Sequence, residues 1–361
     1  MAIRGIICGT GRAGTYLHYG ALKAAGAEIV AFVDINEEMA KNSSKQYGVK
    51  NYYTSVEEAL TKESNIDFVD ICTYSATHLP IAKVALEHGC NVLIEKPITE
   101  TIEEVEELAR LREKHNRVVC AVHNHRFYPG VTKAREMVKS GELGDIVSIH
   151  REMNFNHDNV RMMEETHWSH GLPGGRLFEA NPHNMYLIYS MIGEFDVVDI
   201  QPRKVYKNRW PHAAIDEFSA MLKSEKTSIS LKMSMHCEKS TYGNHAPNFF
   251  VVVGTKKTII FDYQNIHELN ELNGISNRLS NKVSNRFFSK ESHPVVKDQN
   301  GDKVNIGIGS GHRWILDRFI GYLEGRYESE PVPFDEALFV QKMNSKMGLM
   351  VEEKIEKAAK L

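Results

Sequence analysis

The sequence contains little cysteine and lacks a long apolar run. No Cys-x-x-Cys pair is present among its five cysteines, so the pattern indicates neither a redox pair nor a cysteine-rich zinc site. No stretch approaches the roughly 18 to 20 apolar residues that cross a bilayer, and the first residues lack the features of a signal peptide. We therefore expect a protein of the reducing cytoplasm without a membrane partner. The cysteines, which lie mostly in or beside apolar runs, are expected to be small and buried: Cys8, Cys72, Cys90, Cys120 and Cys237.

An excess of one charge is also missing. The 44 Lys and Arg residues nearly balance the 47 Asp and Glu residues, and the formal net charge is −3. This balance provides no electrostatic reason to expect nucleic acid as a partner. With 42% apolar and 25% charged residues, the composition excludes a disordered or repeat-dominated chain. A length of 361 residues predicts about two domains.

The N-terminal third alternates short β-branched runs with helix-like segments, which is typical of parallel βαβ units. The clearest helix spans residues 101–115, where Thr101 and Glu104 form a capping box. The pattern predicts strands at residues 3–7, 29–33, 68–72, 92–94 and 118–122.

After about residue 123 the apolar and polar residues alternate, which predicts a mainly antiparallel sheet. The expected strands are residues 146–155, 197–206, 218–222, 228–235, 249–253 and 258–261, with helices at 182–191 and 335–357. The polar, Asn- and Ser-rich segment 264–311 is predicted to be a long loop or insertion. The fold class is therefore α/β, with a doubly wound parallel sheet in residues 1–122. Residues 123–361 should form an α+β domain with a largely antiparallel open sheet, for substrate binding and oligomerisation.

A Gly-x-Gly-x-x-Gly turn follows the first predicted strand directly and opens a helix. The first glycine permits a tight turn, the second lets a pyrophosphate approach the backbone, and the third lets helix and strand pack closely. Asp34 ends the second strand, where a carboxylate accepts hydrogen bonds from the adenosine ribose. Together these features predict a Rossmann dinucleotide site, and Asp34 favours NAD over NADP because it repels a 2′-phosphate. The predicted cofactor residues of the turn are Gly9, Thr10, Gly11, Arg12, Ala13 and Gly14, of which Arg12 could swing toward a phosphate.

Several later motifs complete a family pattern: residues 73–78, Glu95-Lys96-Pro97, Asn124-x-Arg126-Phe127, and a Gly-Gly-x-Leu stretch that leads to His183. With them the chain resembles the Gfo/Idh/MocA family, named after glucose-fructose oxidoreductase, inositol dehydrogenase and rhizopine catabolism. The resemblance covers nearly the whole chain, with segment 264–311 matched least. It implies a Rossmann domain, a C-terminal domain whose open sheet mediates homodimers or homotetramers, and hydride transfer between NAD and a secondary hydroxyl carbon of a sugar, cyclitol or sugar derivative.

Lys96 stands at the carboxyl end of a parallel strand, where open α/β sheets bind their ligands. Pro97 favours an extended backbone before it. Oxidation of an alcohol releases the hydroxyl proton together with the hydride, and a nicotinamide cation nearby favours a neutral amine. Lys96 is therefore expected to hold or relay that proton. The alternative is a surface lysine paired with Glu95.

The second catalytic candidate lies in Glu179-Ala-Asn181-Pro182-His183. Asn181 as N-cap and Pro182 as first helical residue would place His183 in the first turn of a helix. The helix dipole disfavours imidazolium and a nearby carboxylate favours it, so His183 could act as a base near neutral pH. The resemblance implies that Glu179, which replaces the usual aspartate, shares this work. It also places Tyr186 where many members carry an acid, which suggests a bulkier or less hydroxylated substrate ring. A capping or core role for His183 stays open.

The resemblance gives further residues a place near the ligands. Ser75 and His78, with Thr73 and Glu95, are expected near the nicotinamide and its ribose, although Tyr74 replaces the usual proline. Two residues at the predicted domain junction, Asn124 and Arg126, should meet the substrate or hold the domains together.

Three aromatic residues precede the presumed catalytic segment: His167, Trp168 and His170. We expect them to line the substrate cleft, because aromatic rings can stack on a sugar face. The many histidines also raise a zinc hypothesis, but no glutamate accompanies them as in the metalloprotease helix, and a metal site is not expected.

Three functions remain open from the sequence. The first is an NAD-dependent dehydrogenase in which Lys96 and His183 move protons and Glu179 assists. The second is a redox-neutral enzyme that oxidises a sugar transiently to permit elimination, glycoside hydrolysis or epimerisation. The third is a cofactor-binding sensor or scaffold, which the joint presence of these three residues disfavours.

Overall fold

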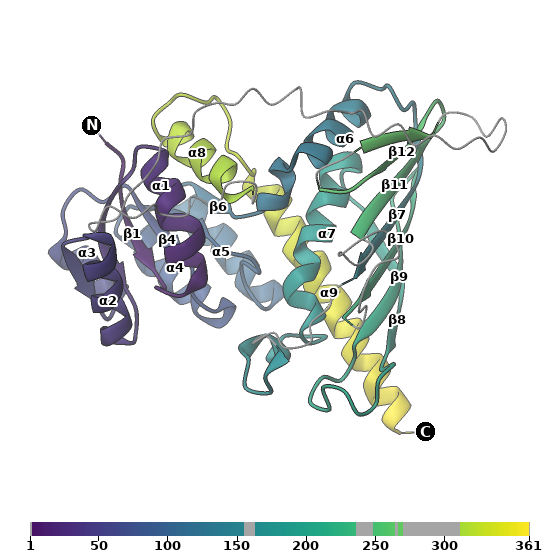
Figure 1. The fold of residues 1–361 in the computed structure, drawn as a ribbon, viewed down its shortest axis with the longest axis horizontal. Helices are drawn as coiled ribbons and strands as arrows, with labels where there is room; N and C mark the ends of the chain where they lie inside the picture. Colours follow the sequence, from purple (N-terminus) through teal and green to yellow (C-terminus); the bar gives the residue numbers. More distant parts are fainter. Residues whose placement is uncertain (1, 155–162, 236–247, 264–265, 270–310, 361) are drawn as a thin grey trace.

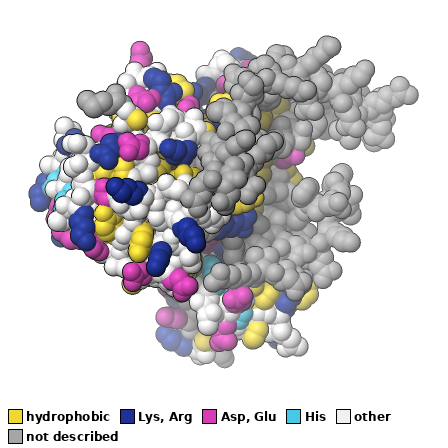
Figure 2. Space-filling view, turned by 60° about the vertical axis from the view of Figure 1, so that its left-hand side comes forward, with side chains coloured by type: hydrophobic (Ala, Val, Ile, Leu, Met, Phe, Trp, Pro, Cys, Tyr) yellow, Lys and Arg dark blue, Asp and Glu magenta, His cyan; other side chains and the backbone are white. Residues whose placement is uncertain are grey.

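The structure is a computed structural model and describes residues 2–154, 163–235, 248–263, 266–269 and 311–360. Two sheets lie at opposite ends of the long axis, with helices between them, and the two termini lie at opposite corners (Figure 1). Within the described residues, no helix is long and apolar enough to cross a bilayer. Positive and negative side chains are interspersed over the described surface of the face in Figure 2.

The first sheet has six parallel strands in the order β3-β2-β1-β4-β5-β6. Its central strands are buried, which explains why they appear in the sequence as continuous apolar runs. The strand order reverses between β1 and β4, and ligands of such sheets bind at the carboxyl ends near this point. The strands are β1 (Arg4–Cys8), β2 (Glu28–Val33), β3 (Asn51–Tyr53), β4 (Phe68–Ile71), β5 (Asn91–Ile94) and β6 (Val119–Ala121).

The predicted parallel sheet is confirmed, and only its edge strand β3 was missed. The helix predicted at residues 101–115 is α5, and its capping box between Thr101 and Glu104 is present. The helical segments of this region are η1 (Arg12–Tyr19), a π-helical turn that continues into α1 (Gly20–Ala24), then α2 (Glu37–Tyr47), α3 (Val56–Lys62), η2 (Ser75–Thr77), α4 (His78–Glu87) and α5 (Ile102–His115). Cys8, Cys72, Cys90 and Cys120 are buried free thiols as expected, and Cys237 lies outside the described residues.

The second sheet has seven strands in the order β13-β12-β11-β7-β10-β9-β8. Only β7 and β10 pair in parallel, and every other pair is antiparallel, as predicted. The strands are β7 (Ile146–Asn154), β8 (Asp196–Arg203), β9 (Glu217–Lys223), β10 (Ser228–Ser234), β11 (Asn248–Gly254), β12 (Thr258–Phe261) and β13 (Ile266–Leu269).

Strand β13 corrects the prediction that segment 264–311 is a loop throughout. This strand has four residues and pairs only with β12 at the sheet edge, so it leaves no long apolar run in the sequence. The rest of the segment, apart from Gly311, lies outside the described residues.

Helices cover one face of the second sheet, with α7 and α9 running between the two sheets (Figure 1). The helices are η3 (Asn124–Phe127), α6 (Pro129–Lys139), η5 (Trp168–Gly171), α7 (Leu177–Ile192), α8 (His312–Leu323) and α9 (Phe334–Ala359). Helix α8 packs back on the first sheet's layer, where Phe319 meets Phe68 edge to edge with 5.6 Å between ring centroids. The division at residues 122 and 123 stays a prediction.

Candidate active site

The three glycines of the turn after β1 differ in what surrounds them. Gly9 has φ +94, and a Cβ there would lie 2.6 Å from the carbonyl oxygen of Cys72. A Cβ on Gly14 would collide with the carbonyl oxygen of Gly9, whereas a Cβ on Gly11 would meet nothing within 4 Å. The turn is therefore closed on its protein side and open at Gly11, where a pyrophosphate would approach.

Asp34 is fixed beside this turn at the end of β2. Its Oδ2 accepts hydrogen bonds from the backbone nitrogen of Thr10 at 2.9 Å and from Thr10 Oγ1 at 2.8 Å. Its Oδ1 accepts one from the nitrogen of Asn36 at 3.0 Å. Arg12 is exposed on the turn. The carboxylate and the open glycine thus lie at one edge of the sheet, as a bound dinucleotide requires.

His78 and Ser75 tie together the loops that follow β4 and β5. The buried His78 ring lies between the carbonyl oxygens of Pro97 at 3.0 Å and of Thr73 at 3.1 Å. Burial lowers the pKa of His78. Ser75 Oγ donates to Glu100 at 2.7 Å. These residues shape the edge of the sheet near the predicted nicotinamide position.

Glu95 lies in a buried hydrogen-bonded chain that sequence reasoning did not find. Its Oε1 accepts from Nε2 of His18 at 3.0 Å and from Nε2 of His312 at 3.4 Å, and its Oε2 accepts from the backbone nitrogen of Lys96 at 3.0 Å. The other nitrogen of His18 donates to Asp70 at 3.0 Å. An acidic residue inside the apolar strand β4 was the available signal.

His18 and Glu95, which are hydrogen-bonded to each other, carry opposite charges. Burial opposes a charge on His18, but Asp70 and Cys72 beside it raise its pKa well above the ordinary value. Burial likewise opposes ionisation of Glu95, but the hydrogen bonds from His18 and His312 hold its pKa well below the ordinary value. Asn124 Nδ2 donates to Nδ1 of His312 at 3.2 Å, so Asn124 supports this chain at the junction.

Lys96 pairs with Glu179, not with Glu95. Lys96 Nζ donates to Oε1 of Glu179 in a close ion pair, and Arg176 holds the other oxygen, Oε2. Burial opposes ionisation of Glu179, yet these two cations lower its pKa to about 2. The surface pairing with Glu95, considered as an alternative from the sequence, is therefore wrong. The peptide bond between Lys96 and Pro97 is cis.

Helix α7 begins five residues earlier than predicted. Arg176 precedes its first residue, and Pro182 lies inside the helix, so Asn181 is not the N-cap and His183 is not in the first turn. A proline cannot donate to the carbonyl four residues before it. Here Nδ2 of Asn344 on α9 donates to that Phe178 oxygen at 3.1 Å. Support from α9 thus permits the helix to continue through the proline.

His183 is 8% exposed and stacks on His125 with 3.5 Å between ring centroids and 11° between ring planes. Its Nδ1 has no hydrogen-bond partner among the described residues. Burial, followed by the repulsion of positive charge on His125 and Lys96, lowers the pKa of His183 well below the ordinary value. The sequence predicted that a helix dipole and a nearby carboxylate would set the pKa of His183. In the structure burial and neighbouring positive charge set it instead, so His183 is neutral.

Tyr186 and Arg126 form a hydrogen-bonded cluster with Glu336 of α9, in which the Tyr186 ring is buried. Arg126 donates to the Tyr186 hydroxyl, which in turn donates to Oε2 of Glu336 at 2.8 Å. The Tyr186 ring is 1% exposed and stacks on His123 with 4.3 Å between centroids. The predicted substrate contact of Tyr186 and Arg126 is thus taken up by contacts within the protein in this structure.

Of the three aromatic residues before α7, Trp168 and His170 lie on η5 and His167 is its N-cap. The Trp168 ring stacks on Tyr74 with 5.7 Å between centroids, which joins η5 to the loop after β4. The ring of His167 contacts Ser169 through Nδ1 at 2.8 Å, and His170 meets His212 edge to edge. These contacts place η5 beside the loop after β4.

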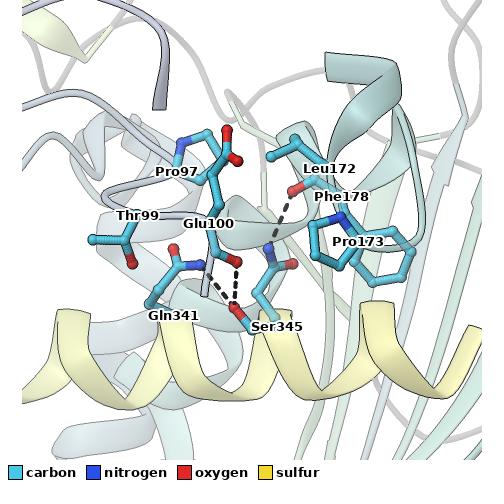
Figure 3. Close-up of a pocket in the computed structure, with 9 residues that line it drawn as sticks. Pro97, Thr99, Glu100, Leu172, Pro173, Phe178, Gln341 and Ser345 are labelled. Atoms are coloured by element: carbon cyan, nitrogen blue, oxygen red, sulfur yellow. Dashed lines mark hydrogen bonds between the residues drawn. The ribbon is translucent and has the colours of Figure 1, made fainter. Parts of the chain in front are cut away.

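A small pocket lies where the Lys96 loop and the start of α7 both meet α9 (Figure 3). Ser345 Oγ donates to the carbonyl oxygen of Glu100 at 3.1 Å, and Gln341 donates to Ser345 at 3.1 Å. Helix α9 therefore supports both segments that carry the ion pair. The lining residues are Pro97, Thr99, Glu100, Leu172, Pro173, Phe178, Gln341, Asn344 and Ser345.

Comparison with known families agrees with this arrangement. Residues 3–123 match the family described as "Oxidoreductase family, NAD-binding Rossmann fold", and residues 131–260 match the "GFO/IDH/MocA C-terminal domain". The chain belongs to the Gfo/Idh/MocA family. Its N-terminal region is the NAD-binding Rossmann fold of that family, and the open turn at Gly11 fits the dinucleotide.

The curated proteins that are similar to this chain include an uncharacterized oxidoreductase and a sugar dehydrogenase. The uncharacterized oxidoreductase YhhX of Escherichia coli is 32% identical over 210 residues, which cover 58% of this chain and 56% of that protein. The match covers about half of the length of this relative and of two other curated relatives. A levoglucosan dehydrogenase of Pseudarthrobacter phenanthrenivorans is 22% identical over 79% of this chain and 77% of its own length.

Solved structures show the same Gfo/Idh/MocA fold. The scyllo-inositol dehydrogenase of Lactobacillus casei, crystallised with NAD(H) and scyllo-inositol, has a TM-score of 0.73 at 20% identity, with 99% of this chain and 98% of that chain covered. An oxidoreductase of Thermotoga maritima has a TM-score of 0.71 at 23% identity, with 97% and 98% covered. At these identities the likeness shows the fold alone.

Proposed function

We propose that the protein is an NAD-dependent dehydrogenase that transfers a hydride between nicotinamide and a secondary hydroxyl carbon of a sugar, cyclitol or sugar derivative. The observation that carries this proposal is the convergence of Lys96, Glu179 and His183 near the carboxyl end of β5. Glu179 and His183 are four residues apart on α7, so their side chains lie on one face of the helix. A neutral base and a buried ammonium group at this edge suit alcohol oxidation.

The cofactor preference rests on Asp34. A carboxylate at the end of β2 accepts hydrogen bonds from ribose hydroxyls and repels a 2′-phosphate, and we therefore expect NAD over NADP. The residues that hold the pyrophosphate are those of the glycine turn, above all the open Gly11. Thr73, Ser75, His78 and Glu95 shape the nicotinamide end through the loops that follow β4 and β5.

The hydroxyl proton is assigned to His183, and Lys96 assists at the same oxygen. NAD held by the glycine turn and Asp34 would supply the acceptor for the hydride of the reacting carbon. Neutral His183 accepts the hydroxyl proton, because its lowered pKa leaves the ring unprotonated and its Nδ1 has no hydrogen-bond partner among the described residues. Lys96 donates a hydrogen bond to the same oxygen and stabilises the negative charge that develops there. Glu179 stays ionised and aims the Lys96 ammonium group.

The proposed substrate class is supported by the relatives of the protein and by the residues expected to contact the substrate. Relatives include a D-xylose dehydrogenase and the levoglucosan dehydrogenase. Asn124 lies at the junction, hydrogen-bonded to His312. Trp168 and His170 on η5, with His167 as its N-cap, stay candidates for contacts with a sugar face. Arg126 and Tyr186 are proposed to form the floor of the substrate site. We further propose a cytoplasmic homodimer or homotetramer, built through the open face of the second sheet.

The test is the formation of NADH when the purified protein and NAD are offered sugars, inositols, sugar acids and nucleotide sugars, with NADP in parallel. NADH formation with one group of compounds supports the proposal and identifies the substrate class. Lys96→Ala should still bind NAD while it loses most turnover. If the protein binds NAD, produces no NADH and yet converts a sugar, a redox-neutral reaction replaces the proposal.

A further inference from the structure

His125 lies against the proposed base and belongs to no motif that predicts a role for it. We propose that His125 is a positioning residue for His183, and that its flat ring holds the base in its working orientation. The inference rests on the proposed function, because it assumes that His183 accepts the substrate proton. It concerns how that base is held in place.

The stack between the two rings is close and nearly parallel. The centroids are 3.5 Å apart and the planes differ by 11°, so His125 covers one face of the His183 ring. A ring in such contact cannot rotate about its side-chain bonds without first separating from its partner. The stack therefore restricts the one part of His183 that the helix backbone does not fix.

Stacking matters here because the usual means of orienting a histidine is missing. A histidine that transfers protons is normally oriented by a hydrogen bond to its second ring nitrogen. Nδ1 of His183 has no hydrogen-bond partner among the described residues, although the residue is 8% exposed. Among the described residues, the ring of His125 is the contact that fixes this orientation.

His125 is itself held by two further rings. Tyr128 and Tyr263 meet it edge to edge, with centroids 5.3 Å and 4.7 Å away. The hydroxyl of Tyr263 also accepts a hydrogen bond from Arg151 at 3.1 Å, and Nε of Arg151 donates to Oδ1 of Asn184 at 2.7 Å. Asn184 is the residue after His183, so the same assembly secures both the platform and the helix that carries the base.

The test compares planar and non-planar replacements at residue 125 by kcat and KM. His125→Ala and His125→Leu remove the flat ring, and we expect kcat to fall about 10- to 100-fold, the cost of a slightly misplaced catalytic group. KM and NAD affinity should change far less, because the stack acts on the proton-transfer group. His125→Phe keeps the platform and should recover most of kcat. The exposed His88→Ala serves as a control and should match the wild type.

The outcomes separate the inference from the proposed function. If His183→Asn retains full activity, the base assignment fails and the inference fails with it. If His183→Asn is inactive but His125→Ala and His125→Leu keep the wild-type kcat, the inference alone is overturned. If His125→Phe is as slow as His125→Ala, a ring nitrogen is required and His125 takes part in proton transfer itself, which also overturns the platform. Should His125→Ala fail to fold, His125→Leu, which fills the same space, decides the comparison.

Discussion

Replacing Glu179 by Gln should cost the protein about 3 kcal/mol of unfolding free energy at about pH 7. The pKa of Glu179 is lowered from an ordinary 4.5 to about 2, and each pKa unit corresponds to about 1.36 kcal/mol. The side chain is only 13% exposed, so solvent screens the ion pairs little. The figure also agrees with the roughly 3–5 kcal/mol that is lost when one partner of a buried pair is removed.

The sign of the pH dependence follows from the lowered pKa. A carboxyl group whose pKa is lower in the folded state contributes stability above its unfolded value, near about 4.3, and loses it as the pH falls through the folded value. The difference between the wild type and Glu179→Gln should therefore hold from about pH 7 to about pH 5 and shrink toward about pH 2. Urea unfolding at a series of pH values measures it.

A double-mutant cycle tests whether Lys96 is the partner. Lys96→Met leaves Glu179 paired with Arg176, so the double variant Lys96→Met with Glu179→Gln should cost less than the sum of the single variants by about 1 kcal/mol or more. Glu58→Gln is the matched control, because Glu58 pairs with Lys62 on the exposed surface and should change stability by less than about 1 kcal/mol. Additive costs, or a pH-independent difference, would refute the buried ion triad.

Three further predictions concern the cofactor preference, the start of helix α7 and the buried hydrogen bonds of His18. Asp34→Ala should reduce the preference for NAD over NADP by about tenfold or more in fluorescence titrations, and an unchanged ratio would show that Asp34 does not read the ribose. Asn344→Leu leaves the Phe178 oxygen unpaired and should cost about 1–3 kcal/mol in urea unfolding, whereas no loss would mean another donor serves that oxygen. The raised pKa of His18 means that its pairing with Asp70 stabilises the fold fully below about pH 6.5 and less as the pH rises through the folded value. His18→Asn should therefore lose less stability than the wild type on alkaline titration, and parallel curves would contradict the charge assignment.

Local patterns in the sequence were enough to predict most of the fold. The capping box at Thr101 depends on residues three apart, and the buried strands depend on continuous apolar runs, so both are visible without tertiary information. The strands that were missed, β3 and β13, are short edge strands of three and four residues. Pairing on one side only leaves no apolar pattern from which to predict them.

The site was predictable where chemistry depends on residue type and motif, as for Lys96, Glu179 and the glycine turn. It was not predictable where a distant segment decides the outcome. Asn181 and Pro182 have the local features of a helix start, yet Asn344 supplies the bond that lets α7 begin earlier. Arg176 lies only three residues before Glu179, so their ion pair is local, and it was missed because the helix was predicted to begin only at Pro182.

The buried histidines of the site differ in pKa because they face different charges. On the side of the first sheet, His18 lies between the carboxylates of Asp70 and Glu95, and its pKa is raised. On the other side, burial and the nearby Lys96 lower the pKa of His123 to about 3 and that of His183 well below the ordinary value. His18, whose pKa is raised, is already protonated, so the unprotonated ring of His183, whose pKa is lowered, is the group that we propose to accept a proton from a substrate hydroxyl.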